Sequence, residues 1–306
     1  MKVVVTGGAG FIGHHLVWHL LELEHEVSVV DNFSTGEMGR LILTDELSGE
    51  INLPYGLTIY HLDIVNQPMP EIECDVLIHL AAPISVQESL EDPEKYRKGI
   101  VEGSKRVFDW AKSMDVKHIV VASTAAVYGD SQELPIDEDT VTQPMSPYAK
   151  YKLEMETLLS VYNTKELNCV ALRFFNVYGE GQNDGTKGNS GYLSAIPIFL
   201  RQYNHYEPIT VTGDGLQTRD FIHVQDVCEA ICVAFEQEWQ ADMPIYNVGS
   251  GKEYRIIDLA KTLGGEIQHV EARNEPKRSL SDISSIKREL GWEPKIDLLS
   301  WIKAQK

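Results

Sequence analysis

The N-terminal residues place the strongest constraint on the fold of this chain. An apolar run at residues 3–5 leads into Thr-Gly-Gly-Ala-Gly-Phe-Ile-Gly at residues 6–13, and a helix-period pattern follows. A buried strand, a glycine-rich turn and a helix in this order open a βαβ unit. Gly7 permits the tight turn, Gly10 lets backbone N–H groups approach a pyrophosphate, and Gly13 lets helix and strand pack closely. The sequence therefore predicts a dinucleotide-binding unit at its start.

Short apolar strand patterns alternate with longer helical patterns over the first 175 residues. This alternation predicts an α/β fold with a doubly wound parallel sheet covered by helices on both faces. The predicted strands are residues 2–5, 26–30, 57–62, 75–80, 117–122, 168–174 and 245–248, and the predicted helices are residues 11–23, 93–114, 147–162 and 224–236.

The pattern changes after Phe175. Residues 176–190 are rich in Gly, Asn and Asp and are expected to form a loop, and mixed elements follow. We expect a Rossmann domain at residues 1–175, joined by a returning helix–strand segment near residues 220–249. Residues 176–306 are expected to form most of a smaller α/β domain that binds the substrate.

Composition excludes some classes of partner. The net charge of −19 argues against nucleic acid and anionic membranes, so an anionic ligand needs a local basic pocket. No apolar run approaches membrane-spanning length and a strand begins almost at once, so we expect no signal peptide and a cytoplasmic location. Cys228 and Cys232 share a helical face, but no histidine or second such pair accompanies them. We therefore expect buried, reduced thiols and no metal site, for Cys74 and Cys169 as well.

An acidic residue ends the second predicted strand. Asp31 lies 24 residues after Gly7, where a carboxylate can bind the hydroxyls of the adenosine ribose. The same charge would repel a 2′-phosphate, so the position favours NAD over NADP. Asp63 and Ile64, after the third strand, are placed to flank the adenine.

A tyrosine and a lysine share one face of a later predicted helix. Ser146 and Pro147 are a good helix start, and Tyr148 and Lys152 then lie one turn apart. Tyrosine is a poor base at neutral pH because its pKa is about 10. A lysine ammonium and a cationic nicotinamide nearby would both favour the phenolate. An ordinary amphipathic helix with a solvent-facing lysine remains the alternative for this spacing alone.

The ordered motifs together resemble the extended short-chain dehydrogenase/reductases of the NAD-dependent epimerase/dehydratase family. Within that superfamily they are similar to the nucleotide-sugar epimerases, typified by UDP-galactose 4-epimerase. The motifs are residues 6–13, 79–82, 123–129, 148–152, 173–176 and 213–224, and the likeness continues through Asp282 to residues 290–294.

The resemblance implies a role for each matching position. Tyr148 would be the base, Lys152 would bind the nicotinamide ribose and tune Tyr148, and Thr124 would hydrogen-bond the reacting oxygen. NAD would be held by Gly7, Gly10, Phe11, Ile12, Gly13, Asp31, Asn32, Ser34, Gly36, Asp63, Ile64, Leu80, Ala81, Ala82, Tyr148 and Lys152. The nucleotide sugar would be held by Ser85, Thr124, Tyr148, Asn176, Arg219, Arg273, Arg278 and Ser279.

Residues beside Thr124 bear on the reaction. Related dehydratases carry Asp-Glu after this threonine and decarboxylases usually carry Glu, whereas this chain has Ala125 and Ala126. Elimination would lack its acid, which leaves oxidation and re-reduction at C4 through a transient 4-keto sugar. The resemblance therefore implies a UDP-sugar 4-epimerase acting on UDP-glucose/UDP-galactose or on their N-acetylated counterparts, because a small Ser279 admits either. UDP-glucuronate epimerase, decarboxylase or dehydratase activity and a non-catalytic NAD-binding scaffold remain alternatives.

The chain departs from the family pattern at three places. Ile100 stands where an asparagine often contacts the cofactor, and Ile84 replaces a lysine of some hexose epimerases. The usual Arg-x-Gly-Asp is degraded at residues 272–275, so Arg273 or Arg278 would be the second diphosphate arginine. For Arg219, a salt bridge to Asp220 is the alternative to diphosphate binding. The family also implies a homodimer formed by residues 93–114 and 147–162.

Overall fold

The computed structural model describes residues 1–44, 51–184, 194–237, 242–272 and 275–306. The chain divides into two compact units. Unit 1 comprises Met1–Ser123, Ser146–Leu172 and Ile231–Ile245, and unit 2 comprises Thr124–Met145, Arg173–Ala230 and Tyr246–Lys306. The units interleave along the chain. The division into residues 1–175 with a returning segment near residues 220–249, and residues 176–306 for most of a second domain, remains a prediction. No helix in the described ranges is long and apolar enough to cross a membrane.

A seven-stranded sheet with the order β12-β8-β7-β6-β1-β2-β5 is present in the described part of the chain. The pairs β1–β2, β2–β5, β1–β6 and β6–β7 are all parallel. The direction of winding reverses between β1 and β6, as in a doubly wound fold. The predicted fold class is confirmed. Its strands are β1 (Lys2–Thr6), β2 (Glu26–Asp31), β5 (Leu57–His61), β6 (Val76–His79), β7 (His118–Thr124), β8 (Asn168–Phe174) and β12 (Ile245–Val248).

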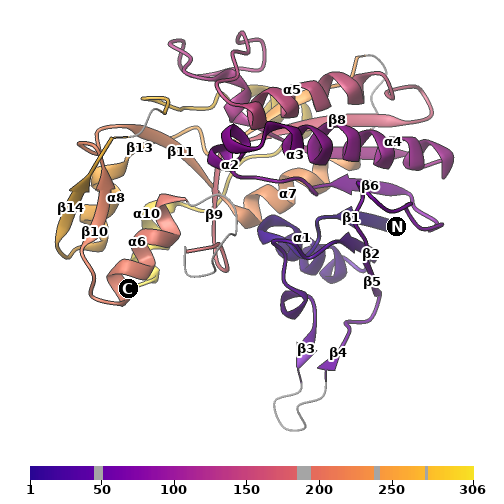
Figure 1. Ribbon diagram of the computed structural model, residues 1–306, viewed down its shortest axis with the longest axis horizontal. Coiled ribbons are helices and arrows are strands. Elements are labelled where there is room, and N and C mark those ends of the chain that lie inside the picture. Colours follow the sequence, from indigo (N-terminus) through magenta and orange to yellow (C-terminus); the bar gives the residue numbers. More distant parts are fainter. Residues whose placement is uncertain (45–50, 185–193, 238–241, 273–274) are drawn as a thin grey trace. The chain divides into compact units, whose positions relative to one another are not determined.

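Helices cover both faces of the sheet in unit 1 (Figure 1). Strand side chains alternate between faces, so Val4 packs under α3, α4 and α5 while Val3 and Val5 point to the opposite face. Helix α1 buries Leu16 and Leu20. The helices and short elements of this unit are α1 (Phe11–Glu22), η1 (Met38–Arg40), the hairpin strands β3 (Leu43–Thr44) and β4 (Ile51–Asn52), α2 (Val86–Glu91), α3 (Pro93–Arg97), η2 (Lys98–Glu102), α4 (Gly103–Ser113) and α5 (Pro147–Ser160).

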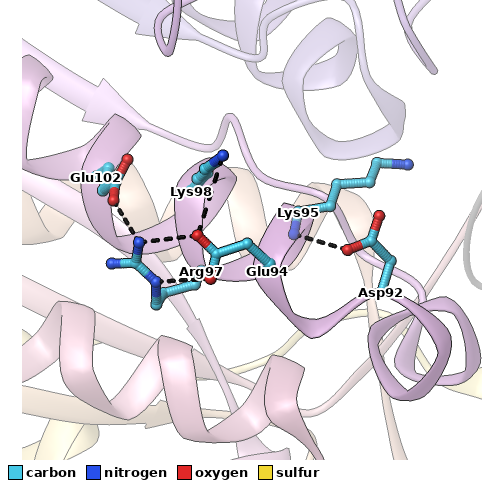
Figure 2. A network of polar contacts seen from close by, with 6 residues as sticks. All are labelled: Asp92, Glu94, Lys95, Arg97, Lys98 and Glu102. Atoms are coloured by element: carbon cyan, nitrogen blue, oxygen red, sulfur yellow. Dashed lines mark hydrogen bonds and ion pairs between the residues drawn. The ribbon is translucent and has the colours of Figure 1, made fainter.

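The helix predicted over residues 93–114 is continuous but contains one π-helical segment, η2. Asp92 caps α3 through the Lys95 N–H, and Arg97 bridges Glu94 and Glu102 across the α3–η2 junction (Figure 2). These exposed pairs add little stability individually but hold the first turns of the helix.

Helix α3 carries a buried tyrosine. The Tyr96 ring lies edge-on against Tyr148 of α5, with centroids 6.4 Å apart and planes at 85°. Its hydroxyl accepts the Ser85 N–H at 2.8 Å and donates to Glu88 at 2.9 Å. Ile100, in the π-helical segment, is fully buried in the same core.

Unit 2 has its own apolar core, formed by α6, α8 and α10 with the short strands β10, β11 and β14. Strands β9, β11 and β13 form one sheet, and β10 pairs with β14. The loop predicted over residues 176–190 is wrong for its first three residues, which pair with β11 as β9; residues 185–190 lie outside the described part. The remaining elements are η3 (Ala125–Tyr128), β9 (Asn176–Tyr178), α6 (Ala195–Asn204), β10 (Ile209–Thr212), β11 (Thr218–His223), α7 (Val224–Phe235), β13 (Glu253–Arg255), α8 (Ile256–Leu263), β14 (Ile267–Val270), α9 (Ser284–Leu290) and α10 (Leu298–Ala304). All four cysteines are buried thiols, as predicted.

Candidate functional site

The glycine-rich turn packs against the chain that follows β6. Gly7 has a φ of +75°, and its N–H donates to the Val30 carbonyl at 2.8 Å. A Cβ atom on Gly7 would lie 2.7 Å from the Ala81 nitrogen, and one on Gly13 would lie 2.2 Å from the Gly7 oxygen. Neither position has room for a side chain. The fold thus brings together three residues predicted to hold the dinucleotide.

Helix α1 begins directly after this turn. Gly10 is its N-cap residue, with no side-chain cap and no acidic residue in the first turn. The first N–H groups of a helix have no intrahelical acceptors, and the helix dipole is positive at this end. Phe11, Ile12 and Gly13 supply such N–H groups here. The turn and helix start therefore fit a dinucleotide pyrophosphate.

Asp31, at the end of β2, is held by backbone donors. Its two carboxylate oxygens accept the Ala9 N–H at 2.9 Å and the Phe33 N–H at 2.7 Å. The side chain is buried, and burial raises its pKa while these donors oppose the shift. Each oxygen keeps a second lone pair for a ribose hydroxyl. A Cβ on Gly36 would lie 2.8 Å from the Ala9 carbonyl carbon, so the loop after β2 lies against the glycine turn.

We predict that replacing Asp31 by Asn will weaken NAD binding about tenfold and reduce the preference for NAD over NADP. The neutral amide is a poorer acceptor for ribose hydroxyls and no longer repels a 2′-phosphate. Titration of both dinucleotides, followed by protein fluorescence, measures the change. Glu22→Gln, on the exposed end of α1, removes the same charge and is the control. Unchanged discrimination in Asp31→Asn would contradict the assignment.

The other predicted cofactor residues lie in unit 1 at or after strand ends. Asn32 accepts the Ser34 N–H at 3.0 Å, and Asp63 accepts the Val65 N–H at 2.9 Å. Ile64 is almost fully buried and packs with the apolar core. Leu80, Ala81 and Ala82 follow β6, where the Leu80 N–H donates to Thr6 and so continues the pairing with β1.

Helix α5 carries the predicted catalytic pair. Ser146 caps it by accepting the Ala149 N–H at 3.2 Å, and Pro147 is the first helical residue. Lys152 is buried, and its Nζ donates to the Ala122 carbonyl of β7 at 2.7 Å. Burial lowers the pKa of Lys152 to about 8, opposed by the carboxylate of Glu156. The solvent-facing lysine that the amphipathic alternative requires is therefore excluded.

Two predicted substrate residues in unit 2 make local backbone contacts. The Thr124 hydroxyl accepts the Ala126 N–H at 3.2 Å and so begins the short turn η3. The Asn176 side chain donates to the Asp220 carbonyl at 2.7 Å, across the β9–β11 pairing. Ser85, in unit 1, caps α2 by accepting the Glu88 N–H at 3.1 Å.

The predicted diphosphate arginines of unit 2 are paired with glutamates. Arg219 is mostly buried and forms a salt bridge with Glu275 at 2.9 Å. The alternative predicted for this residue was a salt bridge with Asp220. Arg278 is more exposed and forms two hydrogen bonds with Glu253, at 2.8 and 2.7 Å. Ser279 is half-buried, and Arg273 lies outside the described residues.

Sequence reasoning missed two buried carboxylates beside the predicted residues. Glu156 lies one turn after Lys152 and accepts the Ser123 hydroxyl. The i, i+4 spacing from Lys152 would have indicated it. Asp220 follows Arg219 and accepts hydrogen bonds from Ser250, Gly251 and Ser281. No local pattern indicates these contacts, because the donors come from distant segments.

Sequence and structure comparisons show which proteins this chain is similar to. Residues 3–249 match the model of the NAD dependent epimerase/dehydratase family. UDP-glucose 4-epimerase of Corynebacterium glutamicum is 31% identical, over 96% of this chain and 91% of the relative. The structure of Thermotoga maritima UDP-glucose 4-epimerase with UDP-glucose has a TM-score of 0.87 at 29% identity, covering 100% of this chain and 97% of that one.

A further similar structure is UDP-N-acetylglucosamine 4-epimerase from Methanobrevibacter ruminantium in complex with UDP-N-acetylmuramic acid. It has a TM-score of 0.85 at 30% identity and covers 100% of this chain and 99% of that one. Both the family model and these relatives span the glycine turn, Asp31 and the Tyr148–Lys152 pair. The chain belongs to the NAD-dependent epimerase/dehydratase family.

Proposed function

We propose that this protein is an NAD-dependent 4-epimerase of a UDP-sugar, either UDP-glucose/UDP-galactose or UDP-N-acetylglucosamine/UDP-N-acetylgalactosamine. The observation that carries the proposal is the buried ammonium of Lys152, held one helical turn from Tyr148 by the Ala122 carbonyl. Such an ammonium favours a phenolate, which can take and return the proton of a sugar hydroxyl. The similar epimerases of known structure support the UDP-sugar as substrate.

Some residues of the chain would bind the cofactor, and Tyr148 would transfer the proton. Gly7, Gly10 and Gly13 would hold the NAD pyrophosphate, and Asp31 the adenosine ribose. When bound, NAD supplies the acceptor and donor of hydride. Tyr148 would remove the proton of the C4 hydroxyl and return it to the same oxygen after the 4-keto sugar has turned its other face. No net oxidation occurs.

The nucleotide end of the substrate would be bound by unit 2. Arg219 and Arg278 offer planar guanidinium groups that suit a diphosphate in this acidic protein. Glu275 and Glu253 hold these groups in place. A diphosphate that takes the place of the glutamates would exchange one ion pair for another, so each guanidinium would keep an anionic partner.

The residues after Thr124 favour epimerisation over elimination. Ala125 and Ala126 form the first half of the turn η3 and carry no ionisable group. Loss of water across C5 and C6 needs an acid and a base beyond Tyr148. Because this turn supplies neither, the 4-keto sugar would be reduced again rather than dehydrated.

Incubation with UDP-glucose, UDP-N-acetylglucosamine and UDP-glucuronate tests the proposal. We expect the C4 epimer of one or both of the first two, resolved by chromatography, with no net change in NADH absorbance. The epimer of UDP-glucuronate alone would move the substrate to a uronate. Release of carbon dioxide or of a 4-keto-6-deoxy sugar would replace epimerisation by decarboxylation or dehydration. NAD binding without turnover of any sugar would support a scaffold instead.

We also propose a cytoplasmic homodimer that pairs α4 and α5 of one protomer with those of its partner. The predicted helices at residues 93–114 and 147–162 lie side by side on one face of the unit 1 sheet (Figure 1). Light scattering of the purified protein measures its mass, and 34.4 kDa would identify a monomer.

A further inference from the structure

Two oppositely charged side chains of α5 are buried together. Lys152 is 4% exposed and Glu156 is 3% exposed. The other charges of the same stretch, Lys150 and Glu154, face solvent. Burying a charge is costly unless another charge or hydrogen bonds compensate it. The i, i+4 spacing of Lys152 and Glu156 places them on one face of the helix, where each can compensate the other.

Consecutive residues of β7 hold the two charges. The Ala122 carbonyl accepts from Lys152 Nζ at 2.7 Å, and the Ser123 hydroxyl donates to Glu156. One strand therefore fixes both ends of the pair against the sheet. The Glu156 carboxylate is therefore held in a defined position on the same face of α5 as Lys152.

Among the titratable groups described around Lys152, Glu156 is the one that favours its ammonium form. Burial lowers the pKa of Lys152 to about 8, and Glu156 opposes this shift. From β6, His79 faces Lys152; burial first and then Lys152 lower its pKa to about 3, so it stays neutral. From α3, the Tyr96 ring packs against Tyr148, but its hydroxyl donates to Glu88.

We propose that Glu156 is a positioning residue that keeps the Lys152 side chain in its ammonium form and thereby keeps Tyr148 able to act as a base. This inference rests on the proposed epimerase function and deepens it. Without the carboxylate, the buried Lys152 would lose its proton at lower pH. A neutral amine no longer favours the phenolate, so turnover would fall.

The pH dependence of kcat in Glu156→Gln tests the proposal. Glutamine keeps the size of the side chain and an acceptor for Ser123 but removes the charge. We expect the alkaline limb, near pH 8 in the unsubstituted protein, to move down by about one unit, because a close opposite charge shifts a pKa by about 1–3 units. Above the limb this is about a tenfold loss of turnover. NAD affinity and the KM for the UDP-sugar should change much less.

Matched variants separate this effect from simple disruption. Glu166→Gln removes the same charge from an exposed position between α5 and β8 and should leave the limb in place. Glu156→Asp keeps a carboxylate but moves it back by one methylene, so its limb should lie between those of the unsubstituted protein and Glu156→Gln. If Glu156→Gln does not fold, Glu156→Asp alone tests the inference. Its carboxylate is moved back by one methylene, so its alkaline limb should lie below that of the unsubstituted protein by less than a unit.

The outcomes also separate this inference from the proposed function. If the enzyme is active and its alkaline limb is the same in Glu156→Gln, the inference is overturned and the function stays intact. The same holds if Glu156→Gln fails to fold and Glu156→Asp keeps the pH profile of the unsubstituted protein. An unsubstituted protein that produces no epimer at any pH overturns the function itself.

Discussion

Replacing Tyr148 by Phe is expected to reduce turnover of the UDP-sugar about a thousandfold while NAD still binds. The substitution removes the hydroxyl that would exchange the C4 proton, and general acid–base catalysis contributes about 10²–10⁴ in rate. The phenylalanine ring retains the packing against Tyr96, which lies 6.4 Å away edge-on. The loss should therefore appear in kcat, with thermal stability and NAD affinity nearly unchanged.

Tyr151→Phe is the control for this variant. Tyr151 lies on the same helix, is half-buried and packs against the same core. It should retain nearly full turnover. Residual activity of Tyr148→Phe above about a tenth of the unsubstituted rate would show that another group moves the proton.

Replacing Asp220 by Ala is expected to destabilise unit 2 by about 4 kcal/mol, because it leaves the two buried donors of Ser281 without an acceptor, at about 1–3 kcal/mol each. The carboxylate is fully buried and accepts five hydrogen bonds. They come from the backbone and hydroxyl of Ser250, the Gly251 N–H, and the backbone and hydroxyl of Ser281. Urea unfolding followed by tryptophan fluorescence measures the loss.

The same variant should also raise the KM for the UDP-sugar. Asp220 follows Arg219 on β11, and the Ser281 segment begins just after Arg278 and Ser279, so one carboxylate anchors both groups of predicted substrate residues. Asp258→Ala, at an exposed position of α8, is the control and should change stability by less than about 1 kcal/mol. A cooperative transition as stable as that of the unsubstituted protein would show that the five bonds are replaced or unimportant.

Strands β1, β6 and β8 of the large sheet could be predicted because each is a nearly continuous apolar run. Strand β8 is buried at every position, and its bounds were predicted without error. The short helix α2 was missed because six residues give too little periodicity to recognise. Strands β9 and β13 have three residues each and pair with β11. Such pairings depend on contacts between distant segments, which no local pattern encodes.

In the candidate site, too, local features could be predicted and contacts between distant segments could not. The glycine turn and Asp31 are local features of one βαβ unit, so spacing alone was enough to indicate them. The partners of the arginines were not predictable, because Arg219 meets Glu275 only after the chain has formed several more elements. Sequence reasoning thus identifies the residues that suit the chemistry more readily than those that hold them.

The π-helical segment at Lys98–Glu102 has a consequence for how this chain can change in length. A π turn contains one residue more than an α turn, and each residue advances an α-helix by about 100°. A deletion elsewhere in the helix would rotate the preceding turns by about that angle, whereas a deletion here would convert the π turn into an α turn and leave the Tyr96 ring against Tyr148. This turn is therefore a place where the helix can lose one residue without moving Tyr96 relative to Tyr148, the predicted base.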